Sequence, residues 1–462
     1  MSHQDQEGRK VRFNFEYLRR ALNWLLQTAI FSSLTFRDDC TWTGSSLAVA
    51  ALLWAWSDEA TLGDRFQTAR KIVQRLLALQ QEPAGSYQAF TKILRRWTPQ
   101  FVALLQAAFR QRMQQALAAR WLLHGFAVFG GDGSRIELPR TKSNEQAYAP
   151  PPQRKKRKRP NQGKQSAAAR AKKANSAQLW LTTLWHAATG LPWDWRLGPA
   201  DSSERGHLLE MLFSLPLEAL IAADAGFVGY DFLSAIVASN RHFLVRVGSN
   251  VRLLRRLGYA RESRGIVYLW PDHAAQRKQR PLVLRLVIAH DGKHPVYLLT
   301  SVLSTSRLSD RQVCDLYRLR WGIELFYRHL KQTYQRRKLK SAAADNVRLE
   351  LEWSLLGLWA MALYAQVELA RKEVPSHKVS IAGVLRAFRR MLRDYLHPAD
   401  PDGSLCKLVQ RAVIDNYARG NKTSRVDHRR KYEQPPGPPD IRLATRAQIK
   451  LATQLAAAQK KG

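Results

Sequence analysis

Four polar residues recur at fixed spacing in the stretch LYRLRWGIELFYRHLKQ, which runs from Leu316 to Gln332. At about 100° per residue, they form one narrow stripe of a helix: Tyr317, Arg320, Glu324 and Lys331. The stripe borders an apolar face, where the floor of a groove would lie; that face is formed by Leu316, Leu319, Ile323, Phe326, Tyr327 and Leu330. The Glu324 carboxylate would then face that groove. The alternative is an ordinary amphipathic helix with an i,i+4 ion pair between Arg320 and Glu324, and mid-helix Gly322 indicates close approach of another backbone.

Two aspartates follow apolar runs that we interpret as strands. Asp132 ends AVFGGD and Asp224 ends LEALIAAD. Either aspartate alone is typical of an ordinary turn, because Asp before a small residue is common where strands end. Together with Glu324 they would form an acidic cluster inside a strongly basic protein, and unpaired buried carboxylates are unfavourable. Two divalent cations would resolve this, since magnesium binds carboxylates together with water and phosphate oxygens, and paired ions activate a water or a 3′-hydroxyl.

The composition indicates a polyanionic partner. The 462 residues include 74 Lys and Arg against 37 Asp and Glu, a net charge of +37. This excess favours nucleic acid, with an acidic membrane surface as the weaker alternative. Three cysteines without a CxxC pair argue against a zinc module and are typical of a reducing compartment. The N-terminal residues lack the apolar run of a signal peptide, and the most apolar stretch, 354–370, is short for a membrane span. We therefore expect a soluble cytoplasmic protein with no membrane partner.

The elements that must position these residues follow from periodicity. Residues 1–124 show helical spacing of apolar residues, with dispersed basic residues that indicate either a solvated face or a DNA-binding surface. FAVFGGDGSRIELP predicts two short strands around a Gly-rich turn. Strands and helices then alternate to about residue 249, and a β-rich stretch covers 250–303. The helix that carries Glu324 should start near Ser309, a plausible N-cap. From Leu349 onward the pattern is mostly helical.

A basic run interrupts this pattern after the first aspartate. Residues 149–176 contain ten Lys or Arg and no acid. The run lacks a hydrophobic pattern, which predicts a mobile phosphate-binding loop rather than a packed element. A nuclear localisation signal is the alternative, and nothing else in the sequence supports it. The densest part comprises Arg154, Lys155, Lys156, Arg157, Lys158 and Arg159.

The order and spacing of the motifs resemble a known family. The spacing Y-x2-R-x3-E-x6-K resembles the signature of transposases of insertion sequence family four. DGSRIELP around Asp132 and ADAGF around Asp224 are similar to the first- and second-aspartate blocks of that family. The resemblance covers roughly residues 125–340, and the basic run after Asp132 departs from the family pattern.

The resemblance implies an α/β fold, in which an RNase H-like mixed-sheet catalytic core with a β-strand insertion is flanked by helical regions. We expect an N-terminal helical DNA-binding region at 1–124 and the first part of the core at 125–249. The insertion would follow at 250–303, the second part of the core at 304–370 and a basic helical region at 371–462.

The resemblance also implies the chemistry. Asp132, Asp224 and Glu324 would bind two magnesium ions, with manganese as an alternative, for hydrolysis at transposon ends and transfer of the freed 3′-hydroxyl to target DNA. Tyr317, Arg320 and Lys331 would contact phosphates. Trp321 and Trp270 are candidate platforms for a displaced base, although a tryptophan is more often a core residue.

The implied partners are double-stranded DNA, as transposon ends and as target, and a second copy of the chain on paired ends. The expected location is the bacterial cytoplasm, in association with the nucleoid. Two alternatives stay open: a transposase-derived DNA-binding protein without catalysis, and an RNase H-like DNA nuclease without strand transfer.

Overall fold

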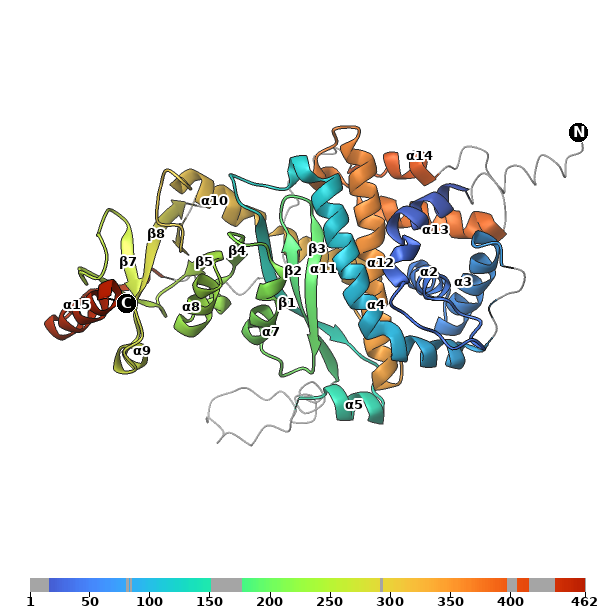
Figure 1. The fold of residues 1–462 in the computed structure, drawn as a ribbon, viewed down its shortest axis with the longest axis horizontal. Coiled ribbons are helices and arrows are strands. Elements are labelled where there is room, and N and C mark those ends of the chain that lie inside the picture. The colour runs from blue at the N-terminus through green and yellow to red at the C-terminus, as the bar shows by residue number, and fades with distance from the viewer. Residues whose placement is uncertain are drawn as a thin grey trace, which may run out of the picture.

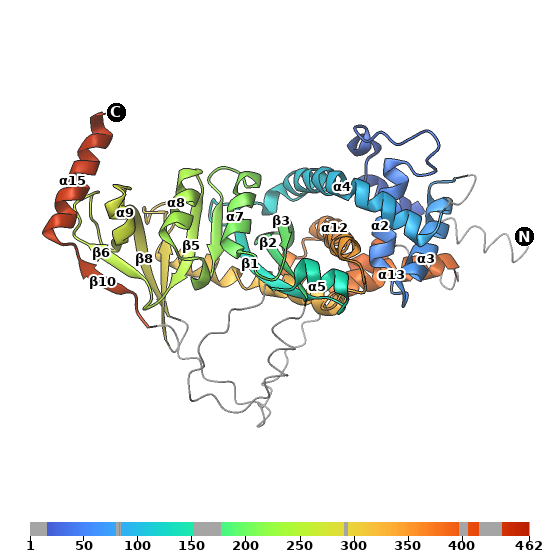
Figure 2. The same ribbon diagram turned by 90° about the horizontal axis from the view of Figure 1, so that it is seen from below.

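A mixed ten-stranded sheet runs through the part of the chain that the structure describes (Figure 1). This computed structural model describes residues 16–79, 83, 85–150, 177–290, 294–396, 405–414 and 437–461. The strand order is β10-β6-β7-β8-β9-β5-β4-β1-β2-β3. The sheet occupies one end of an elongated molecule, and most of the N-terminal helices gather at the other end (Figures 1 and 2).

Five strands form the part of the sheet that carries both aspartates. They are β1 (Val128–Glu137), β2 (Gln178–His186), β3 (Leu191–Gly198), β4 (Leu220–Ala223) and β5 (His242–Val247). β1 and β3 pair antiparallel with β2, whereas β4 lies parallel between β1 and β5. All four residues of β4 are buried, as expected for a parallel strand covered on both faces.

The predicted strand insertion continues this same sheet. It contains β6 (Arg252–Arg255), β7 (Ile266–Leu269), β8 (Leu282–His290) and β9 (Pro295–Thr300), with the short helix α9 (Asp272–Gln276) between β7 and β8. β9 pairs antiparallel with β5 and joins the insertion to the aspartate-bearing strands.

The C-terminal region also contributes an edge strand, β10 (Asp440–Leu443), parallel to β6 and followed by α15 (Arg446–Lys461). The prediction of a mostly helical C-terminal region did not include this strand. A run of four residues carries little periodicity, and its pairing partner lies far away in the sequence.

Helices of both chain ends pack together beside the sheet. After helical residues 16–25 come α2 (Gly44–Trp56), α3 (Leu62–Leu76) and α4 (Tyr87–Ala116), and the later set is α12 (Ala344–Ala370), α13 (Ile381–Leu396) and α14 (Leu405–Gln410). α12 is buried almost all round because it packs against both α4 and α2. Its apolar stretch is thus the predicted core helix, and none of the helices in the described ranges is long and apolar enough to cross a membrane.

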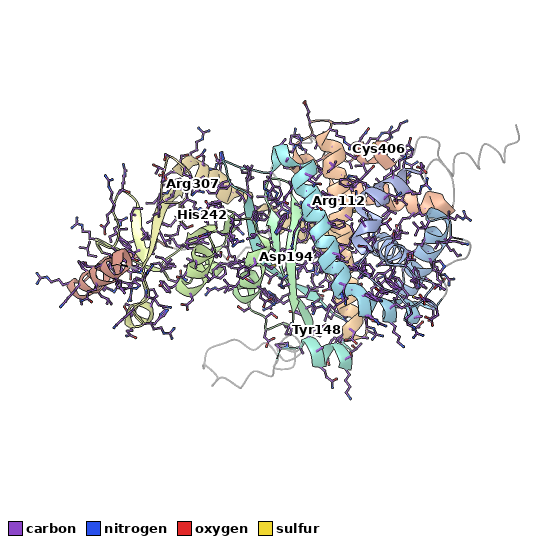
Figure 3. All side chains as sticks on the ribbon, viewed as in Figure 1. Arg112, Tyr148, Asp194, His242, Arg307 and Cys406 are labelled. Atoms are coloured by element: carbon purple, nitrogen blue, oxygen red, sulfur yellow. The ribbon has the colours of Figure 1, made fainter. Side chains whose placement is uncertain are left out.

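The helical region is joined to the sheet through a buried ion pair. Asp194 of β3 has a side chain only 3% exposed, and its Oδ2 lies 3.0 Å from Nη2 of Arg110 on α4. Its Oδ1 accepts from Arg196 Nη1 at 2.9 Å. Figure 3 shows Asp194 in the interior, between the sheet and the long helices. This carboxylate therefore has a structural role, in line with its position outside the motifs.

The prediction of two strands around a Gly-rich turn at Asp132 is wrong. β1 is one strand that continues through GGDG to Glu137. The glycines make room for α7 (Glu204–Met211): a Cβ on Gly131 would lie 2.5 Å from Leu208 Cδ1, and a Cβ on Gly133 would lie 2.4 Å from Glu204 Oε1. Alternate residues of a strand point to opposite faces, and a Cβ on Gly130 would face Ile323 at 3.7 Å. Helix α7 and the Glu324-bearing segment thus lie on opposite faces of β1.

The predicted single helix from Ser309 to Gln332 is broken. α10 (Asp310–Leu319) ends before α11 (Gly322–Arg328), and a π-helical turn follows at His329–Thr333. A Cβ on Gly322 would lie 1.9 Å from Trp185 Cη2, so the predicted close approach is real but involves an indole ring rather than a backbone. Leu319, predicted to be in the core, is 40% exposed because it lies at the break.

Candidate active site

The strand register brings the two motif aspartates level with each other. β1 and β4 pair in parallel, with Val128 opposite Leu220 and Gly130 opposite Ala222. The same offset extended by two residues places Asp132 beside Asp224. β4 ends at Ala223, so Asp224 follows the carboxyl end of a parallel strand, where side chains of neighbouring strands converge.

A tight turn holds Asp224. Its Oδ1 accepts the Gly226 N–H at 2.8 Å and caps a short 3₁₀ turn, Ala225–Phe227. A Cβ on Gly226 would lie 2.9 Å from that oxygen, so a larger residue there would displace the carboxylate from this position. One of the two Asp224 carboxylate oxygens is therefore hydrogen-bonded within the turn.

Glu324 reaches the site from the opposite segment, in the first turn of α11. Its Oε1 lies 3.5 Å from Arg320 Nη2, and the two side chains are 37% and 16% exposed. The guanidinium of Arg320 also lies over the Tyr317 ring, 5.7 Å from its centroid. The polar stripe predicted from the spacing is thus present, although it spans the break between α10 and α11.

The electrostatics couple the three carboxylates. The pKa of Asp132 is raised to about 6, chiefly by burial and also by the neighbouring charges of Asp224 and Glu324, whereas the Gly133 N–H and Arg320 oppose the shift. Asp132 is therefore close enough to both other acids for their charges to oppose its ionisation. Such a site gains from a bound cation.

The last residue of the stripe is directed at β1. Lys331 Nζ donates to Ser134 Oγ at 2.7 Å, and burial lowers the pKa of the Lys331 ammonium. Burial likewise raises the pKa of Tyr317. Lys331 thus contacts β1 at Ser134, two residues after Asp132.

Sequence reasoning missed that Tyr327 carries a positioning contact. Its buried hydroxyl donates to the backbone carbonyl of Asp132 at 2.7 Å, with the Leu181 carbonyl at 3.3 Å. The apolar pattern identified Tyr327 as a core residue but gave no sign of the hydroxyl's partner. This contact ties α11 to β1 at the aspartate itself.

A fourth carboxylate near the pair was also missed. Glu204, at the start of α7, lies against Gly133, and its pKa is raised by burial and by the charges of Asp132 and Asp224. The available signal was local: Ser203 caps a helix whose first residue is acidic. Its proximity to Asp132 depends on how α7 packs on β1.

The donor set fits a hard divalent cation. Asp132, Asp224 and Glu324 offer oxygen ligands only, which suits magnesium. Burial, with Asp224 and Glu324 nearby, raises the pKa of Asp132, so a bound cation would favour its charged form. Across the described part of the chain, no three His, Cys, Asp or Glu side chains converge tightly enough to hold one ion. The Glu324 carboxylate instead lies 3.5 Å from Arg320 Nη2.

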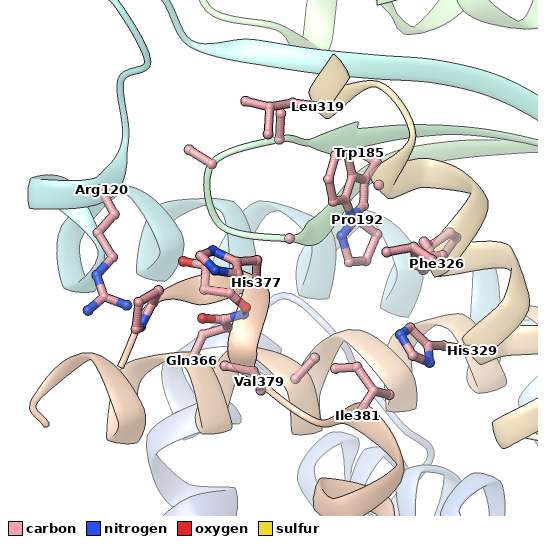
Figure 4. Close-up of a pocket in the computed structure, with 18 of the residues that line it drawn as sticks. Arg120, Trp185, Pro192, Leu319, Phe326, His329, Gln366, His377, Val379 and Ile381 are labelled. Carbon is pink, nitrogen blue, oxygen red and sulfur yellow. The ribbon is translucent and has the colours of Figure 1, made fainter. Parts of the chain in front are cut away.

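The two candidate stacking residues have different environments. Trp270 is 3% exposed and its indole N–H donates to the Gln279 carbonyl, which agrees with the interpretation of a core residue. Trp321 is 58% exposed and lines a cavity of about 790 Å³ between α11, the β2–β3 turn and α12 (Figure 4). None of the three motif carboxylates lines that cavity.

The basic loop residues Arg154, Lys155, Lys156, Arg157, Lys158 and Arg159 lie outside the described residues. The loop departs after α5 (Lys142–Tyr148) and returns just before β2. Because Glu137 pairs with Gln178, the end of β1 beyond Asp132 lies beside the point of return.

Comparisons with known proteins give one consistent result. Residues 132–359 match the family described as Transposase DDE domain. A curated relative, Transposase InsG for insertion sequence element IS4 of Escherichia coli (strain K12), is 28% identical over 184 residues, 37% of this chain. The match spans 40% of that relative's length.

A solved structure of the piggyBac transposase synaptic complex with hairpin DNA aligns over 91% of this chain and 88% of that one. Its TM-score is 0.39 and its identity 14%, values that add nothing to the fold assignment.

Proposed function

Because the chain is a DDE transposase of insertion sequence family four, as the motif spacing predicted, we propose that it cleaves DNA at transposon ends and joins them to a target. The observation that carries this proposal is the electrostatic coupling of Asp132, Asp224 and Glu324 at the end of a parallel strand pair. An excess of positive charge elsewhere in the chain suits the DNA partner.

We also assign the catalytic region to the RNase H-like fold. Its support is the strand order β3-β2-β1-β4-β5, with β2 antiparallel to its neighbours and β4 parallel to β1 and β5. The acids sit on β1, directly after β4 and on the segment that packs against β1. The fold thus accounts for the convergence of residues far apart in sequence.

In this proposal Asp132, Asp224 and Glu324 would hold two magnesium ions, which would activate the attacking oxygen and stabilise the leaving one. Arg320 would release Glu324 and contact a phosphate near the scissile bond. Tyr327 would keep α11 fixed to β1 through the Asp132 carbonyl. A pair of chains would bind two transposon ends before transfer.

The test uses as substrate the DNA that flanks the gene, where the proposed function predicts short inverted repeats. Asp132→Ala, Asp224→Ala and Glu324→Ala should each abolish cleavage in magnesium while DNA binding in a gel shift stays close to wild type. A variant that cuts near the wild-type rate would show that its residue is misassigned.

The same assay separates the two alternatives. A wild-type chain that binds ends without cutting them would be a DNA-binding protein derived from a transposase. Cutting without joined product on a supplied target would indicate a nuclease.

A further inference from the structure

The first turn of α7 contacts the backbone beside both aspartates. Glu204 lies over Gly133, next to Asp132, and Arg205 reaches the turn that follows Asp224. Ser203 caps the helix by accepting the Gly206 N–H at 3.2 Å, which fixes the direction in which both side chains leave.

Arg205 makes a two-pronged contact with the Asp224 turn. Its Nε and Nη2 donate to the Gly226 carbonyl at 2.9 and 2.6 Å. Gly226 in turn donates its N–H to Asp224 Oδ1 at 2.8 Å. A continuous path of hydrogen bonds therefore runs from the guanidinium to the carboxylate through one residue.

Two glycines make room for this contact. A Cβ on Gly229 would lie 3.0 Å from Arg205 Nη1, and a Cβ on Gly226 would lie 2.9 Å from Asp224 Oδ1. The sequence ADAGFVG thus leaves space on both sides of the bonded carbonyl, where larger side chains would have to displace the guanidinium or the carboxylate.

We propose that Arg205 is a positioning residue that fixes the orientation of Asp224, a role that rests on the proposed function. By holding the Gly226 carbonyl, it keeps the turn in the form that engages Oδ1. The other carboxylate oxygen, Oδ2, is then left for a divalent cation. Groups bonded directly to a metal ligand commonly change metal affinity or activity by about 10- to 100-fold when they are removed. Arg205 acts through one intervening residue, so the lower end of that range is expected.

The experiment compares Arg205→Met, which keeps the length but removes every donor, with Arg205→Lys, which keeps one. Mn²⁺ binding to the DNA-free protein is measured by electron paramagnetic resonance. Single-turnover cleavage of pre-bound ends is measured at several magnesium concentrations. The matched control is Arg371→Met, an exposed arginine that pairs with Glu368 on α12.

Arg205→Met should weaken Mn²⁺ binding and raise the magnesium midpoint for cleavage by about 10-fold, the lower end of the range for groups bonded to a metal ligand, and Arg205→Lys should recover part of the loss. The control should match wild type. DNA affinity should change less than metal affinity, because the guanidinium is directed at a carbonyl.

Three results would overturn the role of Arg205. They are unchanged metal binding and rate, weakened DNA affinity with normal metal binding, and a lowered melting temperature alone. A wild-type chain that binds Mn²⁺ through Asp224 but cuts no ends would instead contradict the proposed function. In that case the binding titration would still decide the role of Arg205.

Discussion

Arg320 is only partly satisfied by the groups around it. Its side chain is 16% exposed, and its contact with Glu324 is long, at 3.5 Å. Its Nε is buried without a hydrogen-bond partner among the described residues. An exposed i,i+4 pair would contribute only a few tenths of a kcal/mol, whereas a buried unsatisfied donor is unfavourable. These observations favour a guanidinium that binds an anionic ligand over one that only forms a surface ion pair with Glu324.

We therefore predict that Arg320→Ala slows single-turnover cleavage of pre-bound ends by roughly ten- to a hundredfold, because one charge-assisted contact is worth about 1.5–3 kcal/mol. Arg320→Lys should restore only part of the rate, since lysine lacks the planar fork. Exposed Arg311→Ala on α10 serves as the control. A normal cleavage rate in Arg320→Ala, with only a small loss of stability, would mean that Arg320 only forms an ordinary ion pair with Glu324.

Lys331 offers a second test at the same scale. The bond from Lys331 to Ser134 places the ammonium beside β1, two residues past Asp132. We expect Lys331→Ala to slow cleavage over the same ten- to hundredfold range, roughly, while Ser134→Ala, which leaves the charge in place, should have a much smaller effect. Equal losses in the two variants would mean that Lys331 acts only through its bond to Ser134.

At the scale of elements, the break between α10 and α11 positions Glu324. Gly322, the first residue of α11, lies against the Trp185 ring, which leaves no room for a larger side chain at that position. Gly322→Ala should destabilise the protein by about 1–3 kcal/mol through overpacking, and it should also slow cleavage because Glu324 is two residues away. Trp185→Phe in the same chain should relieve much of the stability loss, as measured by urea unfolding. Purely additive effects of the two substitutions would contradict direct contact.

The β2–β3 hairpin contains a buried histidine that predicts an acid sensitivity. Burial lowers the pKa of His186 to about 3, and its ring contacts Thr189 Oγ1 at 2.9 Å and the Trp121 carbonyl at 3.1 Å. In the unfolded chain the His186 imidazole takes up a proton near pH 6.5, whereas in the folded chain it stays neutral until about pH 3. Stability from this group is thus present above pH 6.5 and declines as pH falls toward 3.

Between pH 7 and pH 5 this decline amounts to about 2 kcal/mol for one histidine. We predict that His186→Gln, although less stable at pH 7, loses less of its free energy of unfolding over that range than wild type does. Urea unfolding at intervals of half a pH unit checks the slope, with exposed His290→Gln as the control. Parallel slopes in wild type and His186→Gln would show that His186 titrates normally.

At the scale of the whole molecule, the described chain resumes after the basic run beside the strand that carries Asp132. β1 runs past Asp132 to Glu137, which pairs with Gln178 at the point where the chain returns from the run. Deletion of residues 154–173 should weaken DNA binding generally and flatten its salt dependence, by about 0.9 in log–log slope for each phosphate that the shortened chain no longer neutralises. Specificity for the ends should survive, because Lys and Arg on phosphates carry no base information. DNA-binding titrations at several salt concentrations test this prediction. An unchanged slope would mean that the run does not contact DNA.

The sequence alone identified the chemical groups and their resemblance to a known family. The spacing of Tyr317, Arg320, Glu324 and Lys331 is local, so helical periodicity was enough to place them on one stripe. Asp132 and Asp224 were identifiable because each follows an apolar run, and burial of such runs is what drives strand formation. The apolar helix before Ala370 was predicted for the same reason. Their roles in metal binding remain predictions.

Only the tertiary structure decided how these groups meet. The glycines around Asp132 predicted a turn, yet β1 runs straight through them because α7 packs against Gly131 and Gly133. The Trp185 ring breaks the predicted long helix at Gly322, and the contact of Arg205 with Gly226 brings a helix to the second aspartate. Each of these features depends on steric contact between segments distant in sequence. Local periodicity contains no information on such contacts, so the sequence specified the residues of the site while packing specified its geometry.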